Sequence, residues 1–157
     1  MSLLNNLQQL CIDKGVSVAV AESCTAGLIA SKLTTVSGSS SYFKGGVVAY
    51  QNEIKTKNLG VSRSIIDEKT EVSAEVVEQM TKSVLEKFDA DFAVATSGYA
   101  GPTGGTNKNP IGTVFIAIAS AEGVVVSRFV FSGNRQSVVN QASESALDLL
   151  YTKIKKQ

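Results

Sequence analysis

The sequence predicts an α/β protein, a three-layer α/β/α sandwich built around a mixed sheet. Short apolar runs alternate with helical segments along most of the chain, which favours parallel strands joined by helices. Two further strand-like runs lie close together near the C-terminus and are typical of an antiparallel hairpin. The 157 residues, of which 43% are hydrophobic, fit one domain at residues 1–157 with a well-covered core.

The first half of the chain is predicted to contain three helices and two strands. Apolar residues recur at helical spacing from Leu3, and Gly15 suits the left-handed position that ends such a helix. The Gly/Ser-rich stretch SGSSS separates the second helix from the second strand. In chain order, the predicted elements are a helix from Leu3 to Cys11, a strand at Val16–Ala21, a helix at Gly27–Val36, a strand at Gly46–Tyr50 and a helix at Asn52–Leu59.

The second half is predicted to add two helices and three strands around a long loop. Ser73 is a good N-cap, and apolar residues follow it at helical spacing. The loop at Ser97–Pro110 holds four glycines and both prolines, which break regular structure. Glu122 and Gly123 suit a hairpin turn. The remaining predicted elements are strands at Phe92–Thr96, Ile111–Ala119 and Val124–Phe131 and a last helix from about Gln136 to Lys153.

The composition excludes several functional classes. Because the chain has no histidine, Ser-His-Asp and Cys-His triads are excluded and a catalytic zinc site is not expected. The net charge of +1 is not clustered, so neither nucleic acid nor a membrane surface is expected as a partner. No apolar stretch approaches a membrane span, and the N-terminus lacks a signal-peptide pattern. Since Cys11 and Cys24 show no disulfide spacing, a cytoplasmic location is expected.

Ser23 follows the first predicted strand, in the segment AESCTAG. A serine there projects from the carboxyl end of a strand, where α/β proteins bind their ligands. The N-terminus of the next helix would offer free N–H groups and a positive dipole end to an oxyanion, near Cys24 and Thr25. The alternative is that Ser23 and Thr25 only cap the helix.

Tyr50 and Lys55 lie in the segment VAYQNEIK. Tyr50 ends the second predicted strand and Lys55 lies one turn into the following helix, so both can face one cleft. A lysine that is desolvated in a cleft loses its proton more easily and can act as a base, and a tyrosine can relay a proton. The alternative is a strand-end tyrosine and a solvated surface lysine.

The third segment, SGYAGPTGGT, lies in the glycine-rich loop. Glycines let the backbone approach a ligand closely and turn its N–H groups inward as an anion-binding nest. The segment matches neither G-x-G-x-x-G nor a Walker A loop, so a nucleoside triphosphate is not indicated. The alternative is a flexible turn between strands.

Taken in order, these segments resemble the CinA C-terminal domain family. The match rests on AESCTAG, VAYQNEIKTKNLGV, SGYAGPTGG and FSGNR, and it extends from Val18 to the last helix. Family members include stand-alone nicotinamide-nucleotide amidohydrolases of the PncC type. The resemblance therefore implies hydrolysis of nicotinamide mononucleotide to nicotinate mononucleotide and ammonia, in pyridine-nucleotide salvage. The N-terminal CinA domain, which resembles molybdopterin-binding proteins, is not expected here, nor is its activity.

The resemblance also implies catalytic roles for Ser23, Tyr50 and Lys55. Ser23 would attack the carboxamide carbon, and Lys55 would take its proton directly or through Tyr50, with no metal or other cofactor. The substrate phosphate would bind the glycine loop, Thr106 or Arg135, although Arg135 could pair with a carboxylate instead. The residues expected to bind the oxyanion or the nucleotide are Cys24, Thr25, Gly98, Ala100, Gly101, Gly104, Gly105, Thr106 and Arg135.

Two alternative functions use the same segments. Cys24 with Glu22 and Lys55 would form a cysteine–carboxylate–lysine set, as in nitrilase-like amidases. A non-catalytic nucleotide-binding or competence-associated module would keep the fold without the reaction.

The chain departs from the usual family pattern at three positions. Ala26 stands where a glycine is more common, Tyr99 where an aliphatic residue is common, and Asn109 where a lysine is common. Because Tyr99 and Asn109 lie in or beside the predicted ligand loop, they are expected to affect substrate preference. The last hairpin leaves a sheet edge to be covered, so a homo-oligomer is expected.

Overall fold

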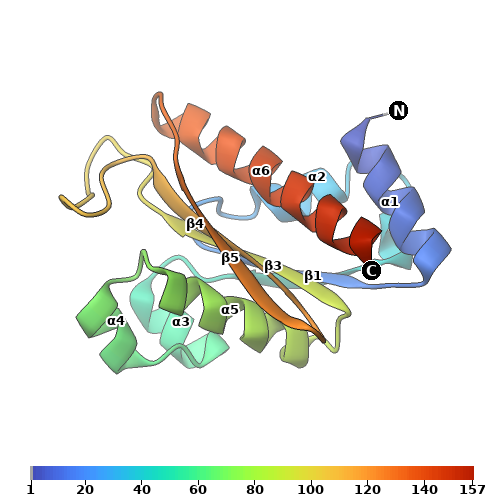
Figure 1. The fold of residues 1–157 in the computed structure, drawn as a ribbon, viewed down its shortest axis with the longest axis horizontal. Coiled ribbons are helices and arrows are strands. Elements are labelled where there is room, and N and C mark those ends of the chain that lie inside the picture. Colours follow the sequence, from blue (N-terminus) through green and yellow to red (C-terminus); the bar gives the residue numbers. More distant parts are fainter. Residues whose placement is uncertain (1) are drawn as a thin grey trace.

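A five-stranded sheet with helices on both faces forms the fold in the computed structural model, which describes residues 2–157 (Figure 1). The strand order is β2-β1-β3-β4-β5. β1 is parallel to β2 and β3, whereas β4 is antiparallel to β3 and β5. The predicted mixed sheet is thus confirmed. The strands are β1 (Val18–Glu22), β2 (Phe43–Val48), β3 (Phe92–Gly98), β4 (Thr113–Ser120) and β5 (Gly123–Val130).

The helices form the two outer layers of the predicted sandwich (Figure 1). One face of the sheet is covered by α1 (Leu3–Lys14), α2 (Leu28–Leu33) and α6 (Arg135–Lys156), and the other by α3 (Asn52–Leu59), α4 (Arg63–Lys69) and α5 (Ala74–Lys87). Val18 and Val20 pack into the first apolar cluster and Ala19 and Ala21 into the second. Because successive strand residues point to opposite faces, burial on both faces explains the unbroken apolar runs.

Two parts of the structure differ from the sequence-based expectation. β2 begins at Phe43 rather than Gly46, and Tyr50 lies beyond its end. Gly45 and Gly46 weaken the strand pattern of this segment in the sequence. A glycine is required at position 46 because a Cβ there would lie 2.2 Å from the Val20 carbonyl oxygen. Helix α4 was not predicted, since its seven residues are too few to give a helical period.

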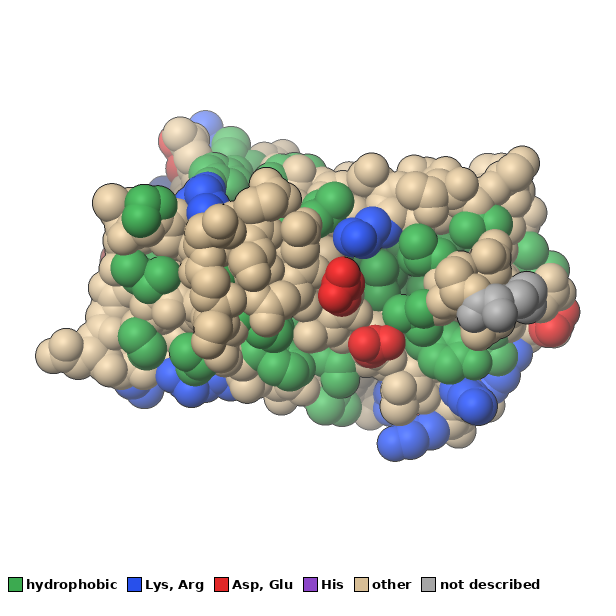
Figure 2. All heavy atoms as spheres, turned by 90° about the horizontal axis from the view of Figure 1, so that it is seen from above, with side chains coloured by type: hydrophobic (Ala, Val, Ile, Leu, Met, Phe, Trp, Pro, Cys, Tyr) green, Lys and Arg blue, Asp and Glu red, His purple; other side chains and the backbone are tan. Residues whose placement is uncertain are grey.

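The outer surface over α1 and α6 carries charged side chains of both signs, scattered among polar and apolar ones (Figure 2). Between residues 2 and 157, no helix is long and apolar enough to span a bilayer. β5 is an edge strand on which Val125 and Val130 are exposed. The homo-oligomer expected from this edge stays a prediction.

The strand order places a switch point at β1. The chain passes from β1 to β2 through α2 on one face, and from β2 to β3 through α3, α4 and α5 on the other. Because β2 and β3 lie on opposite sides of β1, a crevice opens outside the carboxyl ends of β1 and β3, where open α/β sheets bind ligands. Ser23 follows β1, and Ser97 and Gly98 end β3, so all three lie at this crevice.

Candidate active site

A cavity of about 190 Å³ lies at this crevice. This volume is below the roughly 300–1,000 Å³ of typical ligand pockets, so the cavity fits a ring rather than a whole nucleotide. Its walls come from the turn after β1, the loop after β2 and the start of α3, the turn between α4 and α5, the loop after β3 and the start of α6. The predicted site residues that line it are Ser23, Cys24, Tyr50, Lys55, Gly98, Ala100, Gly101 and Arg135.

Ser23 presents a free hydroxyl to the cavity. Its backbone N–H donates to the Thr96 carbonyl at 3.1 Å, which fixes the residue against the neighbouring strand β3. The side chain is 7% exposed, and its hydroxyl makes no hydrogen bond within residues 2–157. The backbone N–H groups of Cys24 and Thr25 likewise donate to no acceptor among residues 2–157. Of these two residues only Cys24 lines the cavity, so an acyl group on Ser23 would have the free Cys24 N–H as a nearby donor.

The N-terminus of α2 is occupied by Glu22, which corrects the expectation that this helix end binds the oxyanion. The helix begins only at Leu28. The carboxylate of Glu22 accepts hydrogen bonds from the N–H groups of Ile29 and Ala30, both at 2.9 Å. It also accepts one from the Thr25 hydroxyl at 2.6 Å. The free donors beside Ser23 are thus turn N–H groups, and the helix serves to hold Glu22.

Lys55 is buried in spite of its charge, with 1% of its surface exposed. Burial lowers the pKa of its ammonium group, and the Glu71 carboxylate and Cys24 partly oppose this. Its Nζ donates to the backbone carbonyl of Tyr50 at 3.1 Å. Lys55 lies in the first turn of α3, so this short helix carries the amine into the cavity beside Ser23. A buried amine with a lowered pKa is suited to accept a proton.

The Tyr50 hydroxyl contacts Arg135, whereas only the backbone carbonyl of Tyr50 contacts Lys55. Nη2 of Arg135 donates to the Tyr50 hydroxyl at 2.6 Å, and Nη1 donates to the Gly101 carbonyl at 2.7 Å. Tyr50 is 53% exposed, so these three residues form the mouth of the cavity. The sequence-based relay from Lys55 through the Tyr50 hydroxyl is not present in this arrangement.

The thiol of Cys24 is buried, which disfavours its thiolate form. Burial raises its pKa to about 12, against smaller opposing effects from Thr96 and Lys55. Glu22, the carboxylate of the alternative cysteine–carboxylate–lysine set, is fully buried and fixed by its three hydrogen bonds. The geometry therefore favours Ser23 over Cys24 as the nucleophile.

Nearly the whole chain matches a single family model, described as the CinA C-terminal domain, over residues 1–154. The chain belongs to the CinA C-terminal domain family. A CinA-like protein from Flavobacterium psychrophilum is 45% identical over 150 residues, which make up 96% of this chain and 36% of that protein. This CinA domain thus spans about a third of the length of the curated relatives it matches.

Solved structures of the same superfamily share the fold of this CinA domain. A CinA superfamily protein from Klebsiella pneumoniae is 32% identical, with a TM-score of 0.94 and coverage of 99% of this chain and 97% of that chain. A second, from Enterobacter cloacae, is 35% identical, with a TM-score of 0.92 and coverage of 97% and 90%. The α/β fold predicted from the sequence is confirmed by these neighbours.

Several predicted site residues of the CinA domain do not line the cavity. The Thr25 hydroxyl is 2.8 Å from the Thr96 hydroxyl and also bonds to Glu22, so it holds the turn instead. Gly104, Gly105 and Thr106 lie farther along the loop, beside a separate shallow depression. The predicted phosphate contacts from these three residues therefore lie outside the cavity that contains Ser23.

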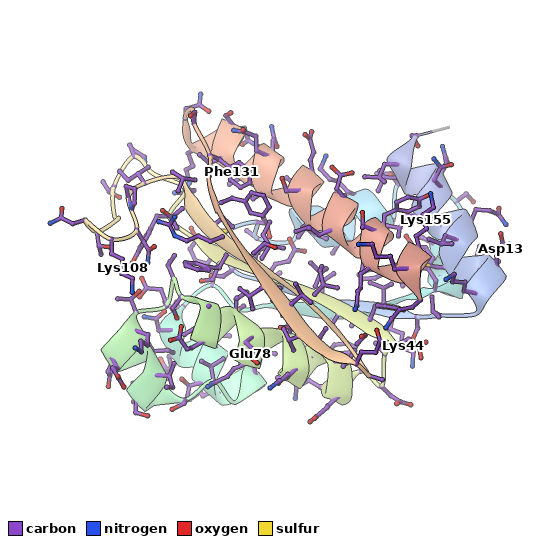
Figure 3. The ribbon with its side chains drawn as sticks, viewed as in Figure 1. Asp13, Lys44, Glu78, Lys108, Phe131 and Lys155 are labelled. Carbon is purple, nitrogen blue, oxygen red and sulfur yellow. The ribbon has the colours of Figure 1, made fainter. Side chains whose placement is uncertain are left out.

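Asn109 also lies outside the cavity. Its Nδ2 donates to the Val72 carbonyl at 3.3 Å, and its Oδ1 accepts from Nε of Arg128 at 3.1 Å. The neighbouring Lys108 points away from the molecule (Figure 3). Asn109 thus anchors the loop and does not contact a ligand in the cavity, whereas Tyr99 does line it.

Four residues that sequence reasoning missed complete the cavity wall: Asn52, Glu71, Ser97 and Thr103. Ser97 and Asn52 lie beside predicted residues, at the end of β3 and in the first turn of α3, so their position along the chain could have suggested them. Glu71 offered no such signal. It lies in the turn between α4 and α5, and the first of these helices was itself unpredicted.

Proposed function

We propose that this CinA domain hydrolyses the carboxamide of nicotinamide mononucleotide, giving nicotinate mononucleotide and ammonia. The main support for this proposal is that the free hydroxyl of Ser23 shares one cavity with the buried Lys55, whose pKa is lowered by burial. Serine with a neutral amine as base is a known solution for acyl transfer without histidine.

In the first half-reaction, the neutral amine of Lys55 takes the proton from the Ser23 hydroxyl as Oγ attacks the carboxamide carbon. The negative charge on the carbonyl oxygen is stabilised by the free N–H group of Cys24, which lines the cavity. The C–N bond then breaks, the proton on Lys55 passes to the leaving nitrogen, and ammonia departs. Ser23 is left as the nicotinoyl ester.

In the second half-reaction, water attacks the ester carbon and Lys55 takes the water's proton. The bond between the acyl carbon and the Ser23 oxygen breaks, and the serine oxygen takes that proton back from Lys55. The carboxylic acid then gives its own proton to Lys55 and becomes a carboxylate. One water is consumed for each amide, and the products are a carboxylate, ammonia and one proton. That proton leaves Lys55 for ammonia or the solvent before the next cycle.

The nucleotide would place its pyridine ring in the cavity and its ribose phosphate at the mouth. The small cavity supports this arrangement, because it does not hold the whole nucleotide. Arg135 has five N–H donors, of which those to Tyr50 and Gly101 are used. Three donors stay free for phosphate oxygens, so Arg135 can bind the phosphate while it shapes the mouth.

Ammonia release from nicotinamide mononucleotide, nicotinamide and nicotinamide riboside tests this proposal. We expect release from the mononucleotide above all, and a loss of at least about 1,000-fold in Ser23→Ala. Ser31→Ala, an exposed serine on α2, is the matched control and should keep the parental rate. Folded protein that binds the mononucleotide but releases no ammonia from it would contradict the proposal and favour a non-catalytic binding module.

A further inference from the structure

Glu71 places a carboxylate in the cavity that the hydrolysis steps above do not use. It lines the cavity with Ser23 and Lys55. Its backbone carbonyl accepts a hydrogen bond of 2.6 Å from the Ser97 hydroxyl, at the end of β3. The turn is further held by Thr70, whose hydroxyl is 3.3 Å from the Val72 N–H. The backbone of Glu71 is therefore fixed at the cavity wall.

The carboxylate itself has no partner in the protein. Across residues 2–157, it makes no side-chain hydrogen bond and no ion pair within 4.0 Å. This differs from Glu22, which accepts three hydrogen bonds, and from Glu53, which pairs with Lys57 on the surface. Glu71 is half-buried, and its charge acts on Lys55. A half-buried carboxylate without a fixed partner is free to interact with a ligand's donors.

The substrate amide and the product acid differ at the group that reaches Ser23. The two groups have nearly the same shape, but the amide offers two N–H donors whereas the acid carries a negative charge. A carboxylate nearby accepts a hydrogen bond from the amide and repels the acid.

The state of Lys55 at the end of the reaction makes this difference important. Once the Ser23 oxygen has taken the proton back from Lys55, the carboxylic acid product gives its own proton to the amine, which leaves a carboxylate beside an ammonium group. An ammonium group in a buried site would hold that carboxylate tightly. The negative charge of Glu71 offsets the ammonium charge, so the product is bound less strongly.

We propose that Glu71 sets the discrimination between the carboxamide substrate and the carboxylate product: it accepts a hydrogen bond from the amide nitrogen and promotes release of the acid by charge repulsion. This rests on the proposed amidohydrolase function, since it needs the carboxamide beside Ser23. Glu71 is thus a specificity residue, and loss of its charge should strengthen binding of the product.

The test compares affinities for nicotinamide mononucleotide and nicotinate mononucleotide by calorimetry in a Ser23→Ala background, where no turnover occurs. We expect Glu71→Gln to tighten binding of the acid about ten-fold or more and to leave binding of the amide unchanged or weaker. Glu75→Gln, which removes a charge from α5 outside the cavity, is the matched control and should change neither affinity. Glu71→Asp keeps the charge and should stay close to the parent.

In the active enzyme, Glu71→Gln should show stronger product inhibition by nicotinate mononucleotide than the parent. An acid affinity that is unchanged or weaker in folded Glu71→Gln would overturn the role of Glu71. Ammonia release by the parent is measured first and separates the two proposals: without it the amidohydrolase function fails, whereas release together with unchanged product affinity contradicts the role of Glu71 alone.

Discussion

The Tyr50 hydroxyl accepts a hydrogen bond of 2.6 Å from the Arg135 guanidinium, across 85 positions of sequence. This contact joins the loop after β2 to the first residue of α6, and the second bond of Arg135, to Gly101, adds the loop after β3. Three segments thus meet at one guanidinium. Tyr50 therefore lies at the mouth of the cavity, where its hydroxyl holds Arg135, and the proposed mechanism assigns proton transfer to Lys55 alone.

The shared contact predicts non-additive effects of substitutions at Tyr50 and Arg135. We expect Tyr50→Phe and Arg135→Lys each to raise KM for nicotinamide mononucleotide about ten-fold, with a smaller change in kcat. The double variant should be little worse than either single one, because each change breaks the same hydrogen bond. Steady-state kinetics on all four proteins gives the coupling energy; effects that simply add, or a loss confined to kcat in Tyr50→Phe, would contradict this role.

Lys55→Met is predicted to abolish ammonia release while it increases stability. Burial lowers the folded-state pKa of Lys55 below its ordinary 10.5, so the unfolded chain binds more protons than the folded chain between these two values. Stability of the parent therefore rises with pH across that window, and below the window the cost of burial is fully present. Methionine removes this cost and should gain about 0.5–2 kcal/mol at neutral pH.

Urea unfolding of the parent and Lys55→Met at several pH values measures this effect. The stability advantage of the variant should shrink as pH rises towards 10.5, because Lys55 is then neutral in both states. An advantage that grows with pH would show that the buried amine is charged in the folded protein. In the parent, kcat/KM should rise with pH through the lowered pKa of Lys55, since the neutral amine is the proposed base.

Glu22→Gln is predicted to destabilise the fold strongly. The buried carboxylate accepts from the N–H groups of Ile29 and Ala30 and from the Thr25 hydroxyl. A glutamine amide can accept through one atom only and places an NH₂ group against a donor, so a cost of about 2–4 kcal/mol is expected. Glu53→Gln breaks an exposed ion pair and should change the free energy of unfolding by less than about 0.5 kcal/mol.

Iodoacetamide is predicted not to abolish the proposed ammonia release by the folded protein near neutral pH. Both cysteines are buried, and burial raises the pKa of each thiol to about 12, so almost no thiolate is present. Cys24→Ala should keep ammonia release within about ten-fold of the parent, because the proposed nucleophile is the Ser23 hydroxyl and not the thiol. Rapid inactivation that Cys24→Ala abolishes would restore the cysteine as the reactive group.

The sequence predicted those parts of the molecule that have a local pattern. The buried strands β1 and β4 are continuous apolar runs, and Ser73 begins α5 as its N-cap, with its hydroxyl accepting from the Val76 N–H at 3.3 Å. Ser23 and Lys55 could be proposed from segments at strand ends, because the carboxyl edge of a sheet collects functional side chains. The motifs and the family resemblance together therefore predicted Ser23 and Lys55, the two residues that the proposed reaction needs.

Contacts between distant segments could not be read in the same way. Glu22 has the spacing of an ordinary strand-end residue, and only the fold turns its carboxylate onto α2. Glu71 reaches the cavity because Ser97 holds its backbone from a different strand. Gly104 and Gly105 looked like an anion-binding loop from composition, but the chain direction after Gly101 carries them away from Ser23. The composition of a loop does not specify the direction in which its backbone runs.

Ala26→Gly is predicted to stabilise the protein. Ala26 has φ +47°, in the left-handed region, where a Cβ costs roughly 1–2 kcal/mol. Glycine removes that strain but loses about 0.5–1 kcal/mol of backbone entropy on folding, so a net gain of up to about 1 kcal/mol is expected. Urea unfolding measures the change, and Ala30→Gly inside α2 is the control that should destabilise instead.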